Sequence, residues 1–227
     1  MSTVELYDTT LRDGAQQQGI TLSVDDKVAI TERLDSIGID YIEGGYAGAN
    51  PKEDEFFSQS RRLSLSHAVV TAFGNTRRPG SNVSGDATIN ALLRTEAPVI
   101  TLVGKASEMQ VLKILETSLE ENLSMIEESV THLIEQDRRV FFDAEHFFDG
   151  YVSNSDYAIR AIRVAAEAGA ECVVLCDTNG GLLPNEIARI TRLVRSSVNV
   201  RLGIHTHNDT DTAVAGALAA FHEGAEQ

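Results

Sequence analysis

Hydrophobic positions along this chain follow two alternating patterns. Short apolar runs recur along the sequence, and longer segments with apolar residues at helical spacing separate them. The runs expected to form strands are Val4–Tyr7, Asp40–Glu43, Ala68–Phe73, Val99–Val103, Arg139–Ala144, Cys172–Cys176 and Arg201–His205. The segments expected to form helices are Ser23–Ile37, Asp54–Arg62, Asp86–Arg94, Glu116–Gln136, Ser155–Ala168, Asn185–Val194 and Asp209–His222.

Several helix boundaries carry their own signals. Ser23 is a candidate N-cap with Asp26 as its capping-box partner, and Gly38 is placed to end the same helix. Pro184 occupies a position where a first-turn proline is favourable. These signals support a regular succession of strand and helix.

The strand–helix alternation predicts a parallel sheet with crossover helices in a single domain, residues 1–227. Seven such units favour a (β/α)8 TIM barrel, which typically takes about 250 residues. An open doubly wound sheet is the alternative, but no Gly-x-Gly-x-x-Gly motif follows the first strand. Because only seven units are counted, we expect the barrel to be truncated before strand 8 and the domain to be incomplete at its C-terminal end.

Composition excludes some classes of partner. The 227 residues carry a formal net charge of -15, with a pI near 4.7, so we expect no binding to nucleic acid or to an anionic membrane surface. Cys172 and Cys176 lie within one apolar run and are interpreted as reduced core residues, which favours a cytoplasmic location. No apolar run is long enough to span a bilayer, and no signal-peptide pattern follows Met1.

The ends of the first and last expected strands carry groups that bind metals. His205 and His207 are two residues apart, so their imidazoles point to the same side of a strand. Asp13, beyond the first strand, could complete a site for Zn²⁺, Mn²⁺, Fe²⁺ or Co²⁺, among which the sequence does not choose. Asn208 and Asp209 could either join this cluster or cap the following helix.

Other strand ends also carry polar residues, and in barrels the reactive groups lie at the carboxyl ends of strands. Arg12 could hold a carboxylate or stabilise an oxyanion. Asp143 and Glu145 share one face of their strand, which makes an inward carboxylate a candidate acid or base, although a solvated loop is the alternative. Glu43, followed by glycines, and Thr178 could approach a substrate or could belong to simple turns.

Six segments together resemble a known superfamily. They are Asp8–Gln16, Asp40–Gly45, Gly48–Lys52, Glu145–Tyr151, Cys176–Gly181 and His205–Asp209. The chain resembles the metallolyase TIM-barrel superfamily, which includes isopropylmalate, homocitrate and citramalate synthases and hydroxymethylglutaryl-CoA lyase. The resemblance is greatest to the citramalate synthase branch.

The resemblance implies a role for individual residues. For the metal these are Asp13, His205 and His207; for catalysis, Arg12 and Glu145; for substrate binding, Gln16, Glu43 and Thr178. It also implies a divalent metal (Zn, Mn, Mg or Co) and acetyl-CoA as a substrate. The family supplies a further asparagine ligand after the eighth strand, so we expect this stretch alone to be weakly active.

The implied reaction is a Claisen condensation of acetyl-CoA with a 2-oxo acid, with pyruvate giving citramalate as the first choice. Isopropylmalate or homocitrate synthesis is the nearest alternative, and a metal-dependent lyase or aldolase on the same scaffold is the next. A non-enzymatic fragment that only binds metal is a further alternative. We expect a homodimer.

Overall fold

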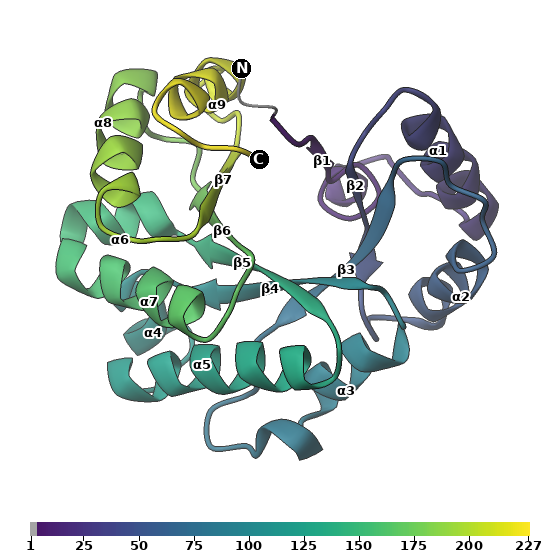
Figure 1. Ribbon diagram of the computed structural model, residues 1–227, viewed down its shortest axis with the longest axis horizontal. Helices are drawn as coiled ribbons and strands as arrows, with labels where there is room; N and C mark the ends of the chain where they lie inside the picture. The colour runs from purple at the N-terminus through teal and green to yellow at the C-terminus, as the bar shows by residue number, and fades with distance from the viewer. Residues whose placement is uncertain (1–3) are drawn as a thin grey trace.

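The computed structural model describes residues 4–227, whose strands form one parallel sheet. The seven strands in this part of the chain are β1 Tyr7–Asp8, β2 Tyr41–Tyr46, β3 Val69–Asn75, β4 Val99–Lys105, β5 Arg139–Glu145, β6 Cys172–Asp177 and β7 Arg201–Thr206. Their order in space is their order in the chain. The sheet curls so that β1 and β7 face each other, with helices around the outside (Figure 1). This is a TIM-barrel-like fold without an eighth strand among residues 4–227, and it excludes the doubly wound alternative, in which the strand order reverses.

The helices cover the outer face of the sheet (Figure 1). They are α1 Val24–Ser36, α2 Pro51–Ser60, α3 Ala87–Arg94, α4 Glu108–Lys113, α5 Leu119–Glu135, α6 Phe147–Ser153, α7 Ser155–Glu167, α8 Pro184–Arg195 and α9 Ala213–His222. None of these helices, which lie within residues 4–227, combines the length and the apolar run that a bilayer crossing needs.

The predicted helix caps are largely confirmed. Ser23 and Asp26 form a reciprocal capping box at the start of α1, and Gly38, just beyond its end, has φ +85°. Pro184 is the first residue of α8. The last helix begins at Ala213 rather than at Asp209, because the intervening residues form a loop in which the Asn208 side chain accepts a hydrogen bond from the Ala213 N–H.

Two short helices, α4 and α6, were not predicted. Both are shorter than the ten or so residues over which a helical period becomes recognisable. The helix α6 begins directly after His146, whose backbone is left-handed with φ +56°. This turn lets the chain leave β5 at once for α6.

The first strand lies later and is shorter than predicted, at Tyr7–Asp8 instead of Val4–Tyr7. The segment before it makes other hydrogen bonds: the Glu5 N–H donates to the Glu226 carbonyl, and the Leu6 carbonyl accepts from the Tyr41 N–H. Only two residues of β1 pair in register with β2. Apolar patterning identified the segment but not where its ladder with β2 begins.

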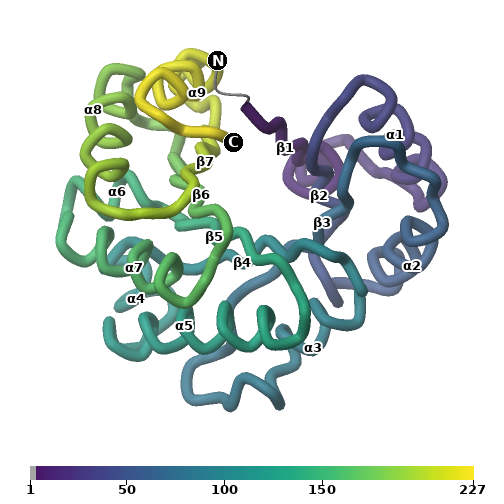
Figure 2. The backbone as a smooth tube through the Cα atoms, viewed as in Figure 1, coloured from purple at the N-terminus to yellow at the C-terminus, as the bar shows by residue number. Residues whose placement is uncertain are grey.

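The last described residues lie between the two end strands. The Glu226 N–H donates to the Leu202 carbonyl of β7, and the Ile204 N–H donates to the Gln227 carbonyl. Together with the Glu5 bond, these contacts link β7 to the start of the chain. Figure 2 shows this yellow segment entering the space between β7 and β1.

The inner face of the sheet changes character along each strand. On β5 the inward residues run from Phe141, which is fully buried, through Asp143 to Glu145. The apolar inner cluster consists of Tyr41, Val99, Phe141, Cys172, Val174 and Cys176. Both cysteines are buried and unpaired with one another, as predicted. The polar residues therefore collect at the carboxyl ends of the strands.

Candidate metal centre and active site

The three predicted metal ligands converge from opposite ends of the sequence. Asp13 lies in the loop after β1, His205 lies on β7, and His207 follows directly. Both Nε2 atoms of the histidines lie 3.4 Å from the same carboxylate oxygen, Oδ2 of Asp13. The imidazole ring centroids are 5.1 Å apart. The alternation of β7 thus places both rings on the side that faces β1.

These donor atoms fit a divalent ion. Ligand atoms at about 2.0–2.2 Å from a common ion lie roughly 3.0–3.5 Å from one another, close to the spacing found here. A second group, Asp143, Cys176 and His205, also brings its donor atoms together. In this second group Asp143 and Cys176 are buried, whereas Asp13, His205 and His207 are all partly exposed, so an ion and a substrate can reach the Asp13 group more readily. The Asp13 group is therefore the better candidate.

Electrostatics also favour a cation at the Asp13 group. Hydrogen bonds from His205 and His207 hold the pKa of Asp13 well below its usual range. Burial alone would lower the pKa of His205, but Asp13 and the neighbouring carboxylates raise it. Both shifts favour a positive charge between the imidazoles and the Asp13 carboxylate, which is the charge that a divalent ion would supply.

Arg12 is fixed beside the metal group on three sides. Its Nε donates to Oε2 of Glu43 at 2.5 Å, and its Nη1 lies 3.3 Å from Oδ1 of Asp13. Its guanidinium carbon lies 3.9 Å from the centroid of the Phe73 ring. Burial alone would lower the pKa of Arg12, but the Glu43 carboxylate offsets this and the pKa is raised. A permanent planar cation therefore faces the cavity beside the metal ligands.

A cavity of about 300 Å³ opens over these residues. Its lining residues are Arg12, Asp13, Gln16, Tyr46, Phe73, Asn75, Val103, Lys105, Asp143, Glu145, Cys176, Thr178, His205 and His207. Glu145 pairs with the Lys105 ammonium group. The Thr178 hydroxyl accepts a hydrogen bond from the His146 N–H at 2.8 Å, which leaves its own proton free to donate. The cavity thus combines cationic, acidic and hydroxyl groups beside the candidate metal ligands.

A β-bulge in β2 shapes one wall of this cavity. The pairing register with β3 shifts between Glu43 and Gly45, so Tyr46 lies opposite Phe73 and lines the cavity. A Cβ on Gly45 would collide with the Glu53 carboxylate, so only glycine fits. Glu53 in turn forms a buried ion pair with Lys27.

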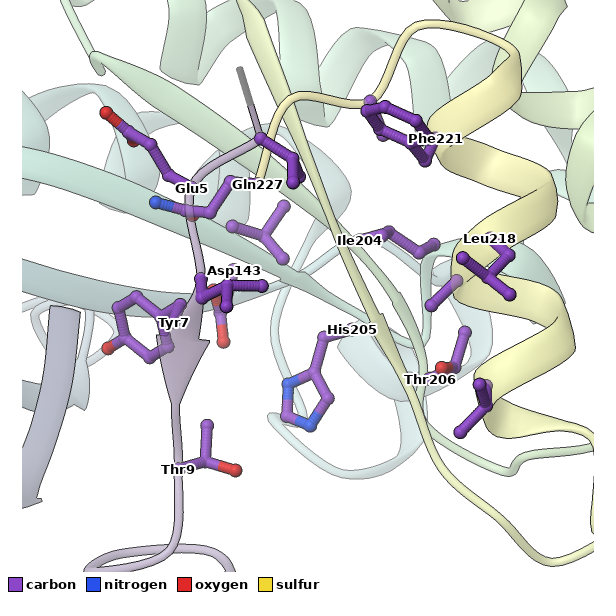
Figure 3. A pocket seen from close by; sticks show the side chains of 16 residues that line it. Glu5, Tyr7, Thr9, Asp143, Ile204, His205, Thr206, Leu218, Phe221 and Gln227 are labelled. Carbon is purple, nitrogen blue, oxygen red and sulfur yellow. The ribbon is translucent and has the colours of Figure 1, made fainter. Parts of the chain in front are cut away.

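Asp143 lies between two cavities. It lines the cavity above the metal ligands and also a mainly apolar cavity of about 450 Å³ between β1 and β7. Figure 3 shows Asp143 and His205 with Tyr7 at the edge of the larger cavity. Burial raises the pKa of Asp143 to about 7. The larger cavity has no comparable set of chemical groups, so the chemistry is concentrated in the smaller one.

Most of the predicted site residues line the cavity, but one of them does not. Gln16, Glu145 and Thr178 line the same cavity as the metal group and Arg12. Glu43 is 0% exposed, lies behind Arg12 and is absent from the cavity lining. Sequence reasoning missed Lys105, which ends β4. Inspection of the carboxyl end of this strand, as was done for other strands, would have identified it.

Comparisons with known proteins agree with this arrangement. Residues 3–227 match the HMGL-like family. The chain is 50% identical over 225 residues to an (R)-citramalate synthase of Aquifex aeolicus, covering 99% of this chain and 43% of that protein. It is 52% identical over 221 residues to one from Streptomyces coelicolor, covering 97% of this chain and 41% of that protein. It thus spans less than half the length of these relatives.

A solved structure is similar in fold. The crystal structure of hydroxymethylglutaryl-CoA lyase from Pseudomonas aeruginosa matches with a TM-score of 0.81 at 22% identity, covering 99% of this chain and 75% of that one. This similarity extends over nearly all of the chain. It identifies the barrel architecture independently of the sequence relatives.

Proposed function

This chain belongs to the HMGL-like family, and we propose that the whole protein condenses acetyl-CoA with pyruvate to form citramalate and free CoA. Two relatives that are about half identical to it carry the name (R)-citramalate synthase. The observation that carries the proposal is the convergence of Asp13, His205 and His207 with Arg12 at one polar cavity. This set suits an α-keto carboxylate, which offers two oxygens to a cation.

The metal ligands and Arg12 would act on the 2-oxo acid. A bound divalent ion would supply Lewis-acid polarisation of the keto group. Arg12 presents a planar fork that suits a carboxylate or a developing alkoxide. The Thr178 hydroxyl, whose oxygen already accepts from the His146 N–H, keeps a proton to donate to a substrate oxygen.

Glu145 is the proposed base. It would take a proton from the methyl group of acetyl-CoA, and the resulting enolate carbon would attack the keto carbon of pyruvate. Lys105, which pairs with Glu145 in the structure, restricts the carboxylate to the cavity side of β5. The alkoxide formed from the keto oxygen takes up a proton, which balances the one removed by Glu145, and water then cleaves the thioester to release citramalate and CoA.

We place the CoA moiety in an adjoining cavity of about 360 Å³. Tyr46, Asn75, Val103, Lys105 and Glu145 line both this cavity and the one above the metal group. Arg78 also lines it and, unlike Arg77, forms no ion pair among residues 4–227. An exposed, unpaired guanidinium beside apolar side chains suits a phosphate group that is joined to a less polar arm.

The proposed function is tested by product analysis. The whole protein would be incubated with acetyl-CoA, one 2-oxo acid and Mg²⁺, Mn²⁺, Zn²⁺ or Co²⁺, and CoA release and the acid product would be measured. We expect citramalate with pyruvate and much slower turnover with 2-oxoisovalerate. A clear preference for 2-oxoisovalerate would reassign the substrate, and absence of condensation with every pair would overturn the proposal. Cleavage of citramalate without condensation would indicate a lyase.

A further inference from the structure

Tyr7 lies at a point where polar side chains from four strands meet. Its hydroxyl lies 2.9 Å from Oε1 of Glu43, 2.8 Å from the Thr71 hydroxyl and 2.6 Å from the Thr101 hydroxyl. These partners come from β2, β3 and β4, while Tyr7 itself is on β1. Figure 3 shows the Tyr7 hydroxyl directed away from His205 and from the cavity between β1 and β7.

The donors and acceptors in this cluster allow one consistent assignment of protons. A phenol has one proton to donate and an oxygen that accepts about two hydrogen bonds. The Glu43 carboxylate pairs with the permanent cation of Arg12 and acts as an acceptor, so Tyr7 donates to Oε1 of Glu43. Thr71 and Thr101 then donate to the Tyr7 oxygen. All three hydrogen-bonding positions of the Tyr7 hydroxyl are therefore filled, and its proton is directed at Glu43.

Glu43 has no contact with solvent and spans two partners. Oε1 accepts from Tyr7 and Oε2 accepts from Nε of Arg12 at 2.5 Å. Because the side chain is 0% exposed, bulk solvent does not reach it to replace either donor. Any rotation of the carboxylate that keeps one bond breaks the other. The orientation of Arg12 therefore depends on the group that holds the far oxygen of Glu43.

We propose that Tyr7, held by Thr71 and Thr101, is a positioning residue that fixes the Arg12 guanidinium through the buried Glu43 carboxylate. Tyr7 does not line the cavity above the metal group, so it acts without touching substrate. Glu43 likewise acts through Arg12. Residues on the inner face of the sheet beneath the cavity would thus orient a catalytic side chain. The expected effect on turnover rests on the proposed function.

Tyr7→Phe removes one oxygen and tests the inference in the whole protein. We expect kcat for condensation to fall about tenfold, as for the loss of one charge-assisted hydrogen bond of roughly 1.4 kcal/mol. Metal content should stay unchanged. The Nε–H signal of Arg12, observed by ¹⁵N NMR with labelled arginine, should broaden or exchange faster with solvent. An unchanged Arg12 signal and an unchanged kcat would overturn the inference.

Tyr41→Phe is the matched control. Tyr41 stacks on Tyr7 with ring centroids 6.2 Å apart, but its hydroxyl accepts from Arg139 rather than from the Glu43 group. We expect it to leave the Arg12 signal and kcat near their wild-type values. An equal effect of both variants would indicate a general packing defect and would also overturn the inference.

A second pair of variants covers the case in which Tyr7→Phe fails to fold. Thr101→Val keeps the side-chain shape and loses the hydroxyl, whereas Thr101→Ser keeps the hydroxyl. We expect a smaller loss of kcat in the first variant and wild-type behaviour in the second. If the wild-type protein releases no CoA, the proposed function fails, and the Arg12 signal in these variants still decides whether Tyr7 positions Arg12.

Discussion

The two end strands of the sheet, β1 and β7, differ from the five strands between them. β1 pairs with β2 at two positions and β7 pairs with β6 at six, and within residues 4–227 each has only one strand neighbour, whereas each of the five middle strands has two. The two end strands position the three candidate metal ligands. The middle strands position Glu43, Lys105 and Glu145.

Because of this difference, substitutions in the two groups of strands should affect different properties, namely metal binding and the stability of the fold. A metal site on two strands that each have a single strand neighbour in the described part of the chain depends on contacts between β7 and the N-terminal segment, such as the ion pair of Arg201 with Glu5 at 2.6 Å. Groups on the middle strands are held by a strand ladder on each side. Changes at the end strands should therefore affect the ion first, and changes behind the middle strands should affect folding first.

The largest expected effect is at the end strands. His207→Ala removes one of three ligands, and we expect bound metal to fall from about one ion per chain to nearly none. Saturating metal should raise the melting temperature of the wild type, by linkage worth about 2.7 kcal/mol at a hundredfold excess over Kd, but not that of the variant. Elemental analysis and thermal unfolding measure both effects. His132→Ala, in α5, is the control, and equal metal loss there would contradict the assignment.

The next effect is behind the middle strands. Lys27, which is 1% exposed, donates to Glu53 at 2.5 Å and to the Gly44 carbonyl at the bulge. Glu53→Ala leaves this ammonium group buried without its carboxylate, and we expect a loss of about 3–5 kcal/mol of unfolding free energy. Urea titration measures the loss.

The double variant Lys27→Met with Glu53→Leu sharpens this test. It removes both charges at similar volume, so we expect it to be much closer to the wild type in stability. A double variant as unstable as Glu53→Ala would mean that packing, rather than the unpaired charge, dominates at this position.

A third change affects catalysis at Arg12, which follows the end strand β1 and contacts Glu43 on the middle strand β2. Arg12→Lys keeps the charge but loses the planar fork that meets Glu43, and we expect kcat of the whole protein to fall roughly 10²-fold with little change in stability. Steady-state kinetics with pyruvate measure the effect. Arg61→Lys, at an exposed ion pair with Glu96, serves as the control. Near-normal turnover by Arg12→Lys would refute the role of the fork.

The smallest effect concerns the loop after β3. Asp86 caps α3 and accepts from the Arg78 N–H and the Ser81 hydroxyl. Burial alone would raise the pKa of Asp86, but these hydrogen bonds offset it and lower the pKa. We expect Asp86→Ala to cost about 1–2 kcal/mol at neutral pH.

The stabilisation by Asp86 should depend on pH in a defined direction. A depressed folded-state pKa means that the Asp86 contribution is present above the unfolded value of about 3.9 and is lost as the pH falls through the folded value. The difference in unfolding free energy between wild type and Asp86→Ala should therefore shrink in acid. Asp86→Asn, which retains a capping oxygen, should lose less at neutral pH. A difference that is constant with pH would exclude the carboxylate as the cause.

Much of the site could be predicted because the direction of side chains along a strand follows from the spacing of neighbouring residues in the sequence. The spacing of His205 and His207 fixed their common side, and the strand-end rule correctly brought Asp13, Glu145 and Thr178 to the same cavity. The inward position of Tyr46 was not predictable in this way, because it depends on a bulge that the Glu53 carboxylate and Gly45 make together.

Whether a side chain faces the cavity or is buried behind it could not be predicted either. Glu43 and Glu145 both come after apolar residues on their strands, and sequence alone does not show that Glu145 faces the cavity while Glu43 is enclosed behind Arg12. The bounds of β1 were wrong for a related reason. Glu5, within the predicted strand, donates to Glu226 near the other end of the sequence, and no local pattern reports such a contact.

The order of the strands has a consequence for how the protein is made. Because neighbours in space are neighbours in the chain, each new strand leaving the ribosome can add to an edge that already exists. Asp13 emerges with β1, whereas His205 and His207 emerge with β7. A nascent chain therefore does not hold these three ligands together until β7 has been synthesised, so metal uptake at this site follows the pairing of the earlier strands.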